Sequence, residues 1–359
     1  MCYNLEGVFM SKLLRIAVAF MIAALVTISL CACGDFTGTE GDPSKATLAM
    51  VYTMDGKDQT AIQWLDDDLN VVATSKYPYS GAMVSFENAK HQDGKLYLVP
   101  TGTFDKKDEN DVAVVDSKTG DYDAIELKST NHVANDVENN NWVISGNGNG
   151  EGFIDLINLE DKTYDSYVSS DLWDAGIMYV ALVDGKVYGI GDEDKTTLYE
   201  IDIENDRIVG LCDFRYDPEV GGPTYLEKHG KDLAFISDGK LIKYNTESGT
   251  KSEVKLSRDD AFQLNIKGDI AWIVYTDVHA DEYDTLIEVR DYNSEKVIAQ
   301  TNCDYAVDQI EPSDKVVYIA GYDKASRFLF DGKKLTFDKH IEYDPKYSEF
   351  NNGGIYVID

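Results

Sequence analysis

Seven short segments of the chain recur at roughly even spacing, and most of them place an aromatic ring beside a carboxyl or amide group. Aromatic faces combined with hydrogen-bonding acids and amides are the groups that bind a sugar, a peptide or a cationic group. The candidate ligand-binding residues are Tyr79, Asn131 with His132, Trp173 with Asp174, Tyr225, Asp260, Tyr305 with Asp308, and Tyr347. The alternative is that these rings only close the hydrophobic core at the ends of structural units.

Acidic loops are the second feature that could do chemistry. Runs of Asp and Glu at residues 105–111, 192–194 and 277–284 offer the oxygen atoms that Ca²⁺ prefers. None of them follows the D-x-[DN]-x-[DN]-G spacing of a calcium loop, and the five histidines lack the spacing of zinc ligands. We therefore expect no cofactor, with Ca²⁺ as the metal that these loops would suit. Solvated loops of a surface protein explain the same acidity.

Nucleophilic catalysis has no support in the sequence. No G-x-S-x-G segment is present, and no serine or cysteine has a base partner that spacing identifies. The glycine-rich segment 146–152 is not followed by a helical pattern, so it does not predict a phosphate site. With 65 Asp and Glu residues, paired carboxylates are too common to identify an acid–base couple.

The elements that must position these residues are β-strands. From Ala46 onward, apolar and polar residues alternate over short runs that end in Asp-Gly or Asn-rich turns. One phrase recurs: an apolar alternation that ends in Asp or Asn, a polar turn, and a second alternating strand. Its markers are Asp66, Asp116, Asn158, Asp202, Asn245, Asp291 and Asp331. The intervals between them run from 40 to 50 residues.

The repeat predicts the fold class. A second apolar strand precedes each of the later markers, so each unit of about 45 residues holds four strands, which is the period of a β-propeller blade. We expect an all-β, seven-bladed β-propeller of four-stranded antiparallel blades. The first unit lacks a fourth strand and the chain ends in a lone strand at 353–359, so this strand is expected to close the ring. Eight blades, or two tandem β-sandwiches, are the alternatives.

This pattern resembles the large propeller superfamily that includes YncE-like and quinoprotein-like bacterial proteins. The resemblance covers residues 46–359 and depends on strand pattern and repeat length. No Trp-Asp dipeptide ends the third strands, so the WD-repeat family is not supported. The four tryptophans do not share one repeat position, so the tryptophan-docked blades of quinoprotein dehydrogenases are not supported either.

The first residues read as a targeting segment. Lys12 and Arg15 precede an uncharged run at 16–30, which is typical of a secretory signal and shorter than a membrane span of about 20 residues. The run ends in Leu-Cys-Ala-Cys-Gly, which resembles the bacterial lipobox. By that resemblance residues 1–32 are a lipoprotein signal peptide, Cys33 is lipidated with acyl chains such as palmitate, and residues 33–45 are a polar tether. A plain cleaved signal or an anchor helix is the alternative.

Composition excludes some partners. The chain has 33 Lys and Arg against 65 Asp and Glu, a net charge of −32, which repels phosphate backbones, so we expect no nucleic-acid partner. Its 43% hydrophobic content can form a core, which excludes a disordered acidic tail. We predict that Cys212 and Cys303 are free and half-buried, because non-adjacent blades hold them beyond the roughly 7 Å that a disulfide spans.

Three classes of function remain, of which the third is a structural role as a docking platform in envelope assembly. The first is a non-catalytic binding module, exported and lipid-anchored at the extracytoplasmic face of the cell membrane. It would bind a protein, a cell-wall glycan or a small ligand through its loop face. The second is an exported metal-dependent enzyme of the lactonase or lyase type, with a divalent metal held by Asn131, Asp174, Asp260 and Asp308. The anchor-like N-terminus and the lack of a catalytic constellation favour the first.

Overall fold

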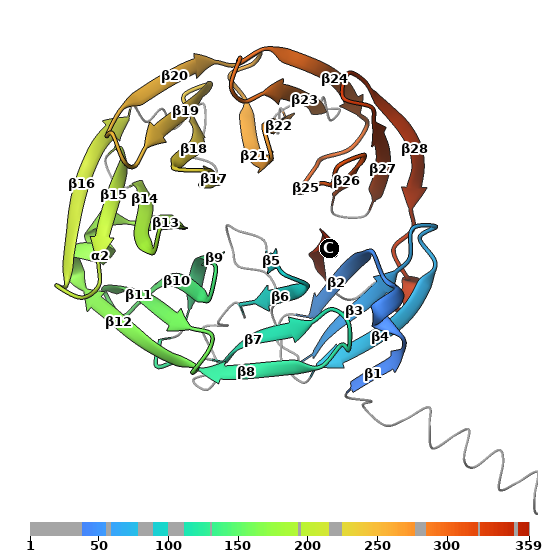
Figure 1. The fold of residues 1–359 in the computed structure, drawn as a ribbon, viewed down its shortest axis with the longest axis horizontal. Coiled ribbons are helices and arrows are strands. Elements are labelled where there is room, and N and C mark those ends of the chain that lie inside the picture. The colour runs from blue at the N-terminus through green and yellow to red at the C-terminus, as the bar shows by residue number, and fades with distance from the viewer. Residues whose placement is uncertain are drawn as a thin grey trace, which may run out of the picture. The chain divides into compact units, whose positions relative to one another are not determined.

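The chain folds as a seven-bladed β-propeller, so the predicted fold class is confirmed and eight blades are excluded. The computed structural model describes residues 38–54, 59–77, 89–99, 111–129, 131–192, 195–214, 225–276, 285–321, 324–347 and 351–358. They belong to a compact unit that runs from Gly38 to Asp359. Figure 1 shows its seven sheets around a central axis. Within the described residues, no helix is long and apolar enough to cross a membrane.

Each blade is an antiparallel sheet whose strands follow one another from the axis to the rim (Figure 1). In this order, blade 1 contains β29 (Asn351–Val357), β2 (Leu48–Met54), β3 (Gln59–Leu65) and β4 (Val71–Tyr77), and blade 2 contains β5 (Lys90–Gln92), β6 (Lys95–Leu98), β7 (Asp111–Asp116) and β8 (Tyr122–Glu126). Blade 3 contains β9 (His132–Glu138), β10 (Asn141–Gly148), β11 (Glu151–Asn158) and β12 (Thr163–Ser169). Blade 4 contains β13 (Ile177–Val183), β14 (Lys186–Asp192), β15 (Thr196–Asp202) and β16 (Arg207–Phe214). Blade 5 contains β17 (Glu227–His229), β18 (Asp232–Ser237), β19 (Lys240–Asn245) and β20 (Lys251–Lys255). Blade 6 contains β21 (Ala261–Lys267), β22 (Ile270–Thr276), β23 (Thr285–Asp291) and β24 (Val297–Cys303). Blade 7 contains β25 (Gln309–Pro312), β26 (Val316–Ala320), β27 (Ala325–Phe330) and β28 (Leu335–Ile341).

The C-terminal strand closes the ring as predicted. β29 is the innermost strand of blade 1 and pairs antiparallel with β2, with Leu48 opposite Val357 and Met50 opposite Ile355. Its side chains are buried: Ile355 is 0% and Tyr356 1% exposed. The first and last parts of the chain therefore share one sheet, which removes two free strand edges.

An additional strand lies at the rim of blade 1. β1 (Gly38–Gly41) pairs with β4, and a short 3₁₀ helix, η1 (Pro43–Lys45), follows it. The Thr39 hydroxyl lies 2.8 Å from the Ser75 hydroxyl and donates a hydrogen bond of 3.1 Å to the carbonyl of Gly120 in blade 2. Residues 38–45 of the expected tether are thus part of the propeller unit, which begins at Gly38 rather than Ala46.

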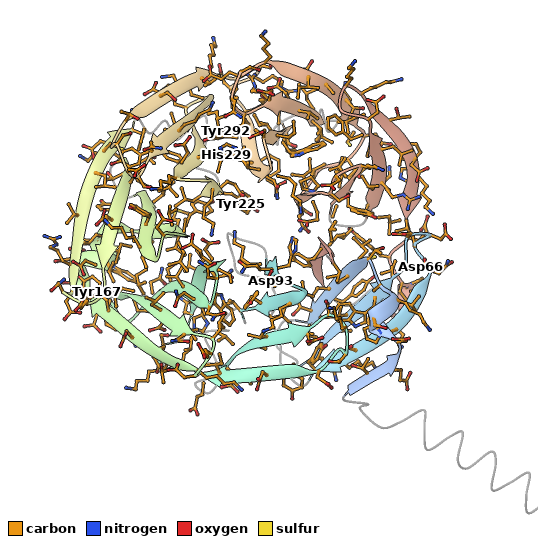
Figure 2. All side chains as sticks on the ribbon, viewed as in Figure 1. Asp66, Asp93, Tyr167, Tyr225, His229 and Tyr292 are labelled. Atoms are coloured by element: carbon orange, nitrogen blue, oxygen red, sulfur yellow. The ribbon has the colours of Figure 1, made fainter. Side chains whose placement is uncertain are left out.

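The seven marker residues have a common structural role at the turn between the third and fourth strands of each blade. In every one, the side-chain Oδ1 atom accepts a hydrogen bond from a main-chain N–H two to four residues later. Asp and Asn are the residues that make such turns. Figure 2 shows one of the markers, Asp66, at the rim. The markers recur because each blade needs this turn.

Removal of one marker side chain tests this role. Asp116 Oδ1 accepts from the N–H groups of Lys118 (2.8 Å) and Thr119 (3.1 Å). We expect Asp116→Ala to lower the free energy of unfolding by about 1 kcal/mol, because both donors lose their partner. Asp116→Asn keeps an acceptor and should cost less than half as much. Urea denaturation measures both variants; equal losses would show that the charge, and not the acceptor, stabilises the turn.

The hydrophobic core lies between blades. Seven clusters of buried side chains each join two neighbouring blades. In one of them Trp142 of blade 3 meets Tyr97 of blade 2 edge-on, with ring centroids 5.3 Å apart. Cys212 is half-buried and Cys303 buried, and both are free, as expected. Burial raises the pKa of the Cys212 thiol to about 11 and that of Cys303 to about 12.

One short helix was not predicted. α2 (Ser170–Ala175) lies between β12 and β13. The Ser169 hydroxyl accepts a hydrogen bond from the N–H of Leu172 and caps the first turn, and Gly176 ends the helix in the left-handed region at φ 57°. Six residues are too few to show a helical period in the sequence.

Candidate functional site

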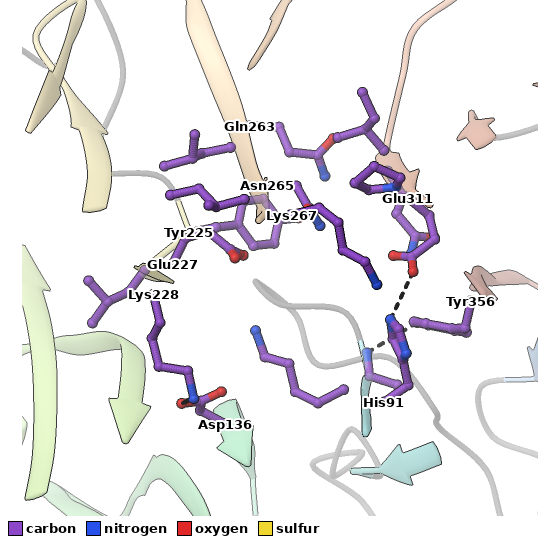
Figure 3. Close-up of a pocket in the computed structure, with 18 residues that line it drawn as sticks. His91, Asp136, Tyr225, Glu227, Lys228, Gln263, Asn265, Lys267, Glu311 and Tyr356 are labelled. Carbon is purple, nitrogen blue, oxygen red and sulfur yellow. Dashed lines mark hydrogen bonds and ion pairs between the residues drawn. The ribbon is translucent and has the colours of Figure 1, made fainter. Parts of the chain in front are cut away.

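A polar cavity of about 210 Å³ lies among the innermost strands (Figure 3). Its walls come from β5, β9, β17, β21, β25 and β29, and from residues just before β5 and β17. The polar and charged lining residues are Lys90, His91, Asp136, Tyr225, Glu227, Lys228, Gln263, Asn265, Lys267, Gln309, Glu311 and Tyr356. Ring closure thus brings strands that are distant in the sequence to one cavity.

Some of these side chains hold neighbouring blades together. The innermost strand of a blade has main-chain groups on its free edge, and such groups need partners when they are buried. Gln309 accepts from the N–H of Ile355 (2.7 Å) and donates to its carbonyl (2.8 Å), so its amide acts like a strand residue. Asp136 accepts from the N–H of Leu182 in the next blade (2.7 Å). This part of the lining is structural.

Two pairs of interacting side chains belong to the same walls. Lys228 Nζ lies 2.6 Å from Asp136 Oδ2, and His91 Nε2 lies 2.8 Å from Glu311 Oε1 (Figure 3). Glu311 also accepts from the N–H of Val357 in the closing strand (3.3 Å). The carboxylates of Asp136 and Glu311 therefore each have two donors within the wall.

Three further charged residues, Lys90, Glu227 and Lys267, line the cavity beside these pairs. Figure 3 shows Glu227 of β17 and Lys267 and Asn265 of β21 directed into the cavity. Glu227 and Asn265 come from neighbouring blades 5 and 6. An acid, an amide and ammonium groups around one cavity can bind a small polar molecule through several hydrogen bonds at once.

Glu227 is electrostatically unusual. Burial raises the pKa of its carboxyl group, and the negative charge of Asp136 adds to this; the ammonium groups of Lys90 and Lys228 and a hydrogen bond from the main chain of Ile266 act in the opposite direction without cancelling it. A carboxyl group with a raised pKa beside a cavity is a candidate functional group. It also destabilises the folded protein where it must ionise.

Glu227→Gln should therefore stabilise the protein at neutral pH. The folded protein binds the Glu227 proton more tightly than the unfolded chain does, so the parent loses stability as pH rises from the unfolded pKa through the folded one. Glutamine cannot ionise, so the gain should vanish at acidic pH, below the unfolded pKa. Urea unfolding across a pH series measures this. The exposed Glu160→Gln should show no such dependence, and a gain for Glu227→Gln that stays constant with pH would contradict the assignment.

The cavity does not suit a divalent metal ion. Hard cations need several oxygen donors, whereas Asp136 and Glu227 have ammonium groups nearby and Glu311 is already paired with the His91 ring. Within the part of the chain that the structure describes, no group of three His, Cys, Asp or Glu residues has metal-binding geometry. The acidic loops expected to offer oxygen atoms fall mostly outside the described residues.

The predicted ligand-binding residues do not gather at one place. Tyr225, just before β17, lines the cavity and lies near the axis in Figure 2. Tyr305 and Tyr347 are buried at 7% and 4% exposure, and their rings pack in the core between blades; Tyr347 stacks on Tyr52 with centroids 4.6 Å apart. Tyr305 and Tyr347 therefore lie where the alternative interpretation puts them, as rings that close the hydrophobic core. Tyr79 and the lipidation candidate Cys33 lie outside the described residues.

The other predicted residues are spread over blades 3, 6 and 7. Asn131 donates from its amide to the Asn147 carbonyl (2.8 Å), and His132 is buried against Phe153. Trp173 (46% exposed) and Asp174 lie in α2. Asp260 forms an ion pair with Arg258, and Asp308 is exposed at the start of blade 7. Asn131, Asp174, Asp260 and Asp308, proposed as metal holders, thus belong to separate positions around the ring.

Three cavity residues that sequence patterns did not single out nevertheless had a detectable signal. Gln263, Asn265 and Lys267 alternate with Leu264 and Ile266 along β21, and a period of two places all three polar side chains on one side of the strand. Innermost strands are expected to be apolar on both faces, so polar residues at every second position of such a strand indicate that one side faces a cavity.

A serine–histidine contact occurs in blade 7 but does not form a nucleophilic site. Ser326 Oγ lies 3.0 Å from His340 Nδ1, and the two residues are direct cross-strand partners on β27 and β28. Ser326 is 1% exposed, so a substrate carbonyl cannot reach its hydroxyl. The two free thiols have raised pKa values, which makes them poor nucleophiles.

Comparison with known proteins supports the fold and no particular family. No family model and no curated protein matches the chain. A protein from Bacteroides fragilis, named for a proposed 6-phosphogluconolactonase activity, is 15% identical with a TM-score of 0.58, and the match covers 88% of this chain and 98% of that one. The Pseudomonas aeruginosa periplasmic gluconolactonase PpgL is 12% identical with a TM-score of 0.57, covering 82% and 96%. AztD from Citrobacter koseri is 10% identical with a TM-score of 0.51, covering 87% and 97%. At these identities the likeness concerns the propeller alone.

Proposed function

We propose that this protein is a binding module that captures a small polar ligand in the central cavity and does not transform it. The observation that carries this proposal is the group formed by Glu227, Asn265 and Lys267, which is directed into the cavity (Figure 3). Glu227 is half-buried and desolvation raises the pKa of its carboxyl group, and a carboxyl group perturbed in this way beside a cavity is typical of a functional site. The buried serine and the thiols with raised pKa values support a non-catalytic role.

A thermal-shift screen tests this proposal. A panel of sugars, amino acids, organic acids and polyamines is added singly to the folded protein. A ligand at 100 times its Kd should stabilise the protein by about 2.7 kcal/mol. Asn265→Ala should remove the shift caused by the hit, whereas Asn293→Ala, at a turn of blade 6 outside the cavity, should not. A panel without any hit, or a hit unaffected by Asn265→Ala, would contradict a ligand site in this cavity.

The alternative is an exported hydrolase of the lactonase type. Two observations favour it over other enzymes: the raised pKa of Glu227, which suits a general acid, and the gluconolactonase names of proteins with this fold. The direct assay follows acid release from glucono-1,5-lactone with a pH indicator, in EDTA and in added Ca²⁺ or Mg²⁺. If the protein hydrolyses the lactone and Glu227→Gln abolishes this activity, the hydrolase interpretation replaces the binding proposal. Rates equal to the uncatalysed reaction would contradict the hydrolase interpretation.

We also propose that the module is anchored to the outer side of a membrane by lipid on Cys33. The support is the lipobox-like segment that ends at Cys33. The first residue of β1, Gly38, follows Cys33 by five residues. A fully extended chain of five residues spans about 17 Å. Cys33→Ser should abolish incorporation of labelled palmitate and release the protein from membranes; retention of the label would refute the anchor.

A further inference from the structure

The cavity is far richer in cations than the rest of the chain. Its lining holds three lysines and three carboxyl groups, whereas the whole chain has 33 basic and 65 acidic residues. Asp136 and Glu311 are engaged within the wall by Lys228, by His91 and by main-chain N–H groups. Lys90, Lys267 and Glu227 complete the charged lining.

The charges of the cavity lining favour binding of an anion, although the protein as a whole is strongly negative. With His91 neutral, the three ammonium groups and three carboxylates of the lining cancel, and protonation of either Glu227 or His91 leaves one positive charge. Desolvation raises the pKa of Glu227, which favours its protonated form. A singly charged anion then restores neutrality, whereas a cation would add to the excess. The hydrogen-bonding groups of Asn265 and Tyr225 suit hydroxyl groups on such a ligand.

We propose that the cavity binds a hydroxylated organic monocarboxylate through Lys90 and Lys267, and that Glu227 takes up one proton from solvent as the anion enters. This inference rests on the proposed function and gives it a ligand class. The negative charge of the ligand beside Glu227 favours the protonated carboxyl, which can then donate a hydrogen bond to the ligand. By linkage, affinity must rise as pH falls.

The other charged groups of the cavity bear on this pH dependence. They are Lys90 and His91 from β5, Asp136 from β9, Lys228 from β17, Lys267 from β21 and Glu311 from β25. The carboxylates of Asp136 and Glu311 are held by donors within the wall. His91 is paired with Glu311 in the same wall, so its effect on binding must be separated from that of Glu227.

Calorimetry on the whole folded protein tests the proposal. The probes are lactate and gluconate, each beside its neutral amide, lactamide and gluconamide, with inorganic phosphate as a second anion. A monocarboxylate should bind at least about tenfold more tightly than its amide. Lys267→Met should remove this preference, Lys90→Met serves if that variant does not fold, and the exposed Lys186→Met is the matched control.

Proton uptake is measured in the same way. The binding enthalpy should differ between two buffers of different ionisation enthalpy, and affinity should fall from acidic to mildly alkaline pH. Glu227→Gln should bind with a pH-independent affinity, whereas a dependence caused by His91 would persist in that variant. Equal binding of acid and amide, tighter binding of phosphate, or no binding of any probe would overturn the carboxylate assignment. If a neutral or cationic compound from the broader panel binds through Asn265 instead, the proposed function stands and only this inference fails.

Discussion

Truncation of the chain before Asn351 should abolish cooperative folding of the propeller. The cut removes β29, the innermost strand of blade 1, whose side chains of Ile355, Tyr356 and Val357 are 0%, 1% and 7% exposed. Burial of side chains of this kind contributes about 1.5–3 kcal/mol each. Their sum alone approaches the roughly 5–15 kcal/mol by which a domain of ordinary stability is folded.

The cut also leaves partners on two neighbouring strands, and one residue just before a third strand, without their bonds. β2 loses its antiparallel ladder, Gln309 of β25 loses both bonds to Ile355, and the N–H of Ala89 loses the Tyr356 hydroxyl (3.1 Å). Far-UV circular dichroism during heating and urea titration measures the outcome.

Deletion of residues up to Gly41 is the matched control for this truncation. It removes β1 from the rim of the same sheet, where the four residues are half-buried or exposed, so unfolding should stay cooperative with a lower midpoint. A peptide of residues 351–359 added to the truncated chain should restore part of the transition. A truncated chain with the midpoint of the parent would disprove closure by β29.

Arg290→Met should destabilise the protein by about 3–5 kcal/mol, because it leaves a buried carboxylate without its cation. Glu288 is 0% and Arg290 6% exposed, on β23 of blade 6. Arg290 donates from Nε (3.0 Å) and Nη2 (2.7 Å) to Glu288 Oε1, which also accepts from the Tyr275 hydroxyl (3.0 Å). Gln300 and Ser257 donate to the other carboxylate oxygen.

The pH dependence of this loss has a definite sign. Burial by itself would raise the pKa of Glu288, but the hydrogen bonds from Ser257 and Arg290 outweigh it and hold the pKa below its ordinary value. The stabilisation is therefore fully present above the unfolded carboxyl pKa and is lost as pH falls through the folded pKa. Arg290→Met should differ most from the parent at neutral pH and least in acid. Urea unfolding at both pH values measures this difference.

A double variant distinguishes the effect of charge pairing between Glu288 and Arg290 from the effect of burying their side chains. Glu288→Gln together with Arg290→Met removes both charges and should recover most of the stability that Arg290→Met loses. The exposed pair of Lys186 and Glu200, 3.1 Å apart, is the control, and Lys186→Met should change stability by less than about 1 kcal/mol. A double variant as unstable as Arg290→Met would show that packing of the arginine, and not charge pairing, is what matters.

Local chemistry explains which features could be predicted from sequence. The turn at Asp116 needs a side-chain acceptor two and three residues before its N–H donors, so the residue type recurs in every blade and marks the repeat. Strand alternation has a period of two, which also belongs to the backbone. The six residues of α2 are too short for a period, and their ends are set by Ser169 and Gly176.

The candidate site could be predicted only in part. Tyr225 precedes an innermost strand and lines the cavity, while its predicted role in ligand binding stays a prediction. Tyr305 and Tyr347 occupy comparable loops yet are buried, since whether such a ring turns toward the axis or the core depends on space between neighbouring blades. The polar alternation that ends at Lys267 was present in the sequence, but only the ring shows that this side of β21 faces a cavity.

The sequence by itself determined the all-β class, the seven repeats, the closing strand and the two free thiols, because each follows from periodicity, turn chemistry or distance along the chain. The tertiary structure alone decided which polar residues meet. Glu227, Lys267 and Lys90 belong to three different blades, and the charge that they present to a ligand depends on how the neighbouring wall groups pair. Electrostatic balance in a cavity depends on distances across the ring, and no local pattern in a chain encodes these distances.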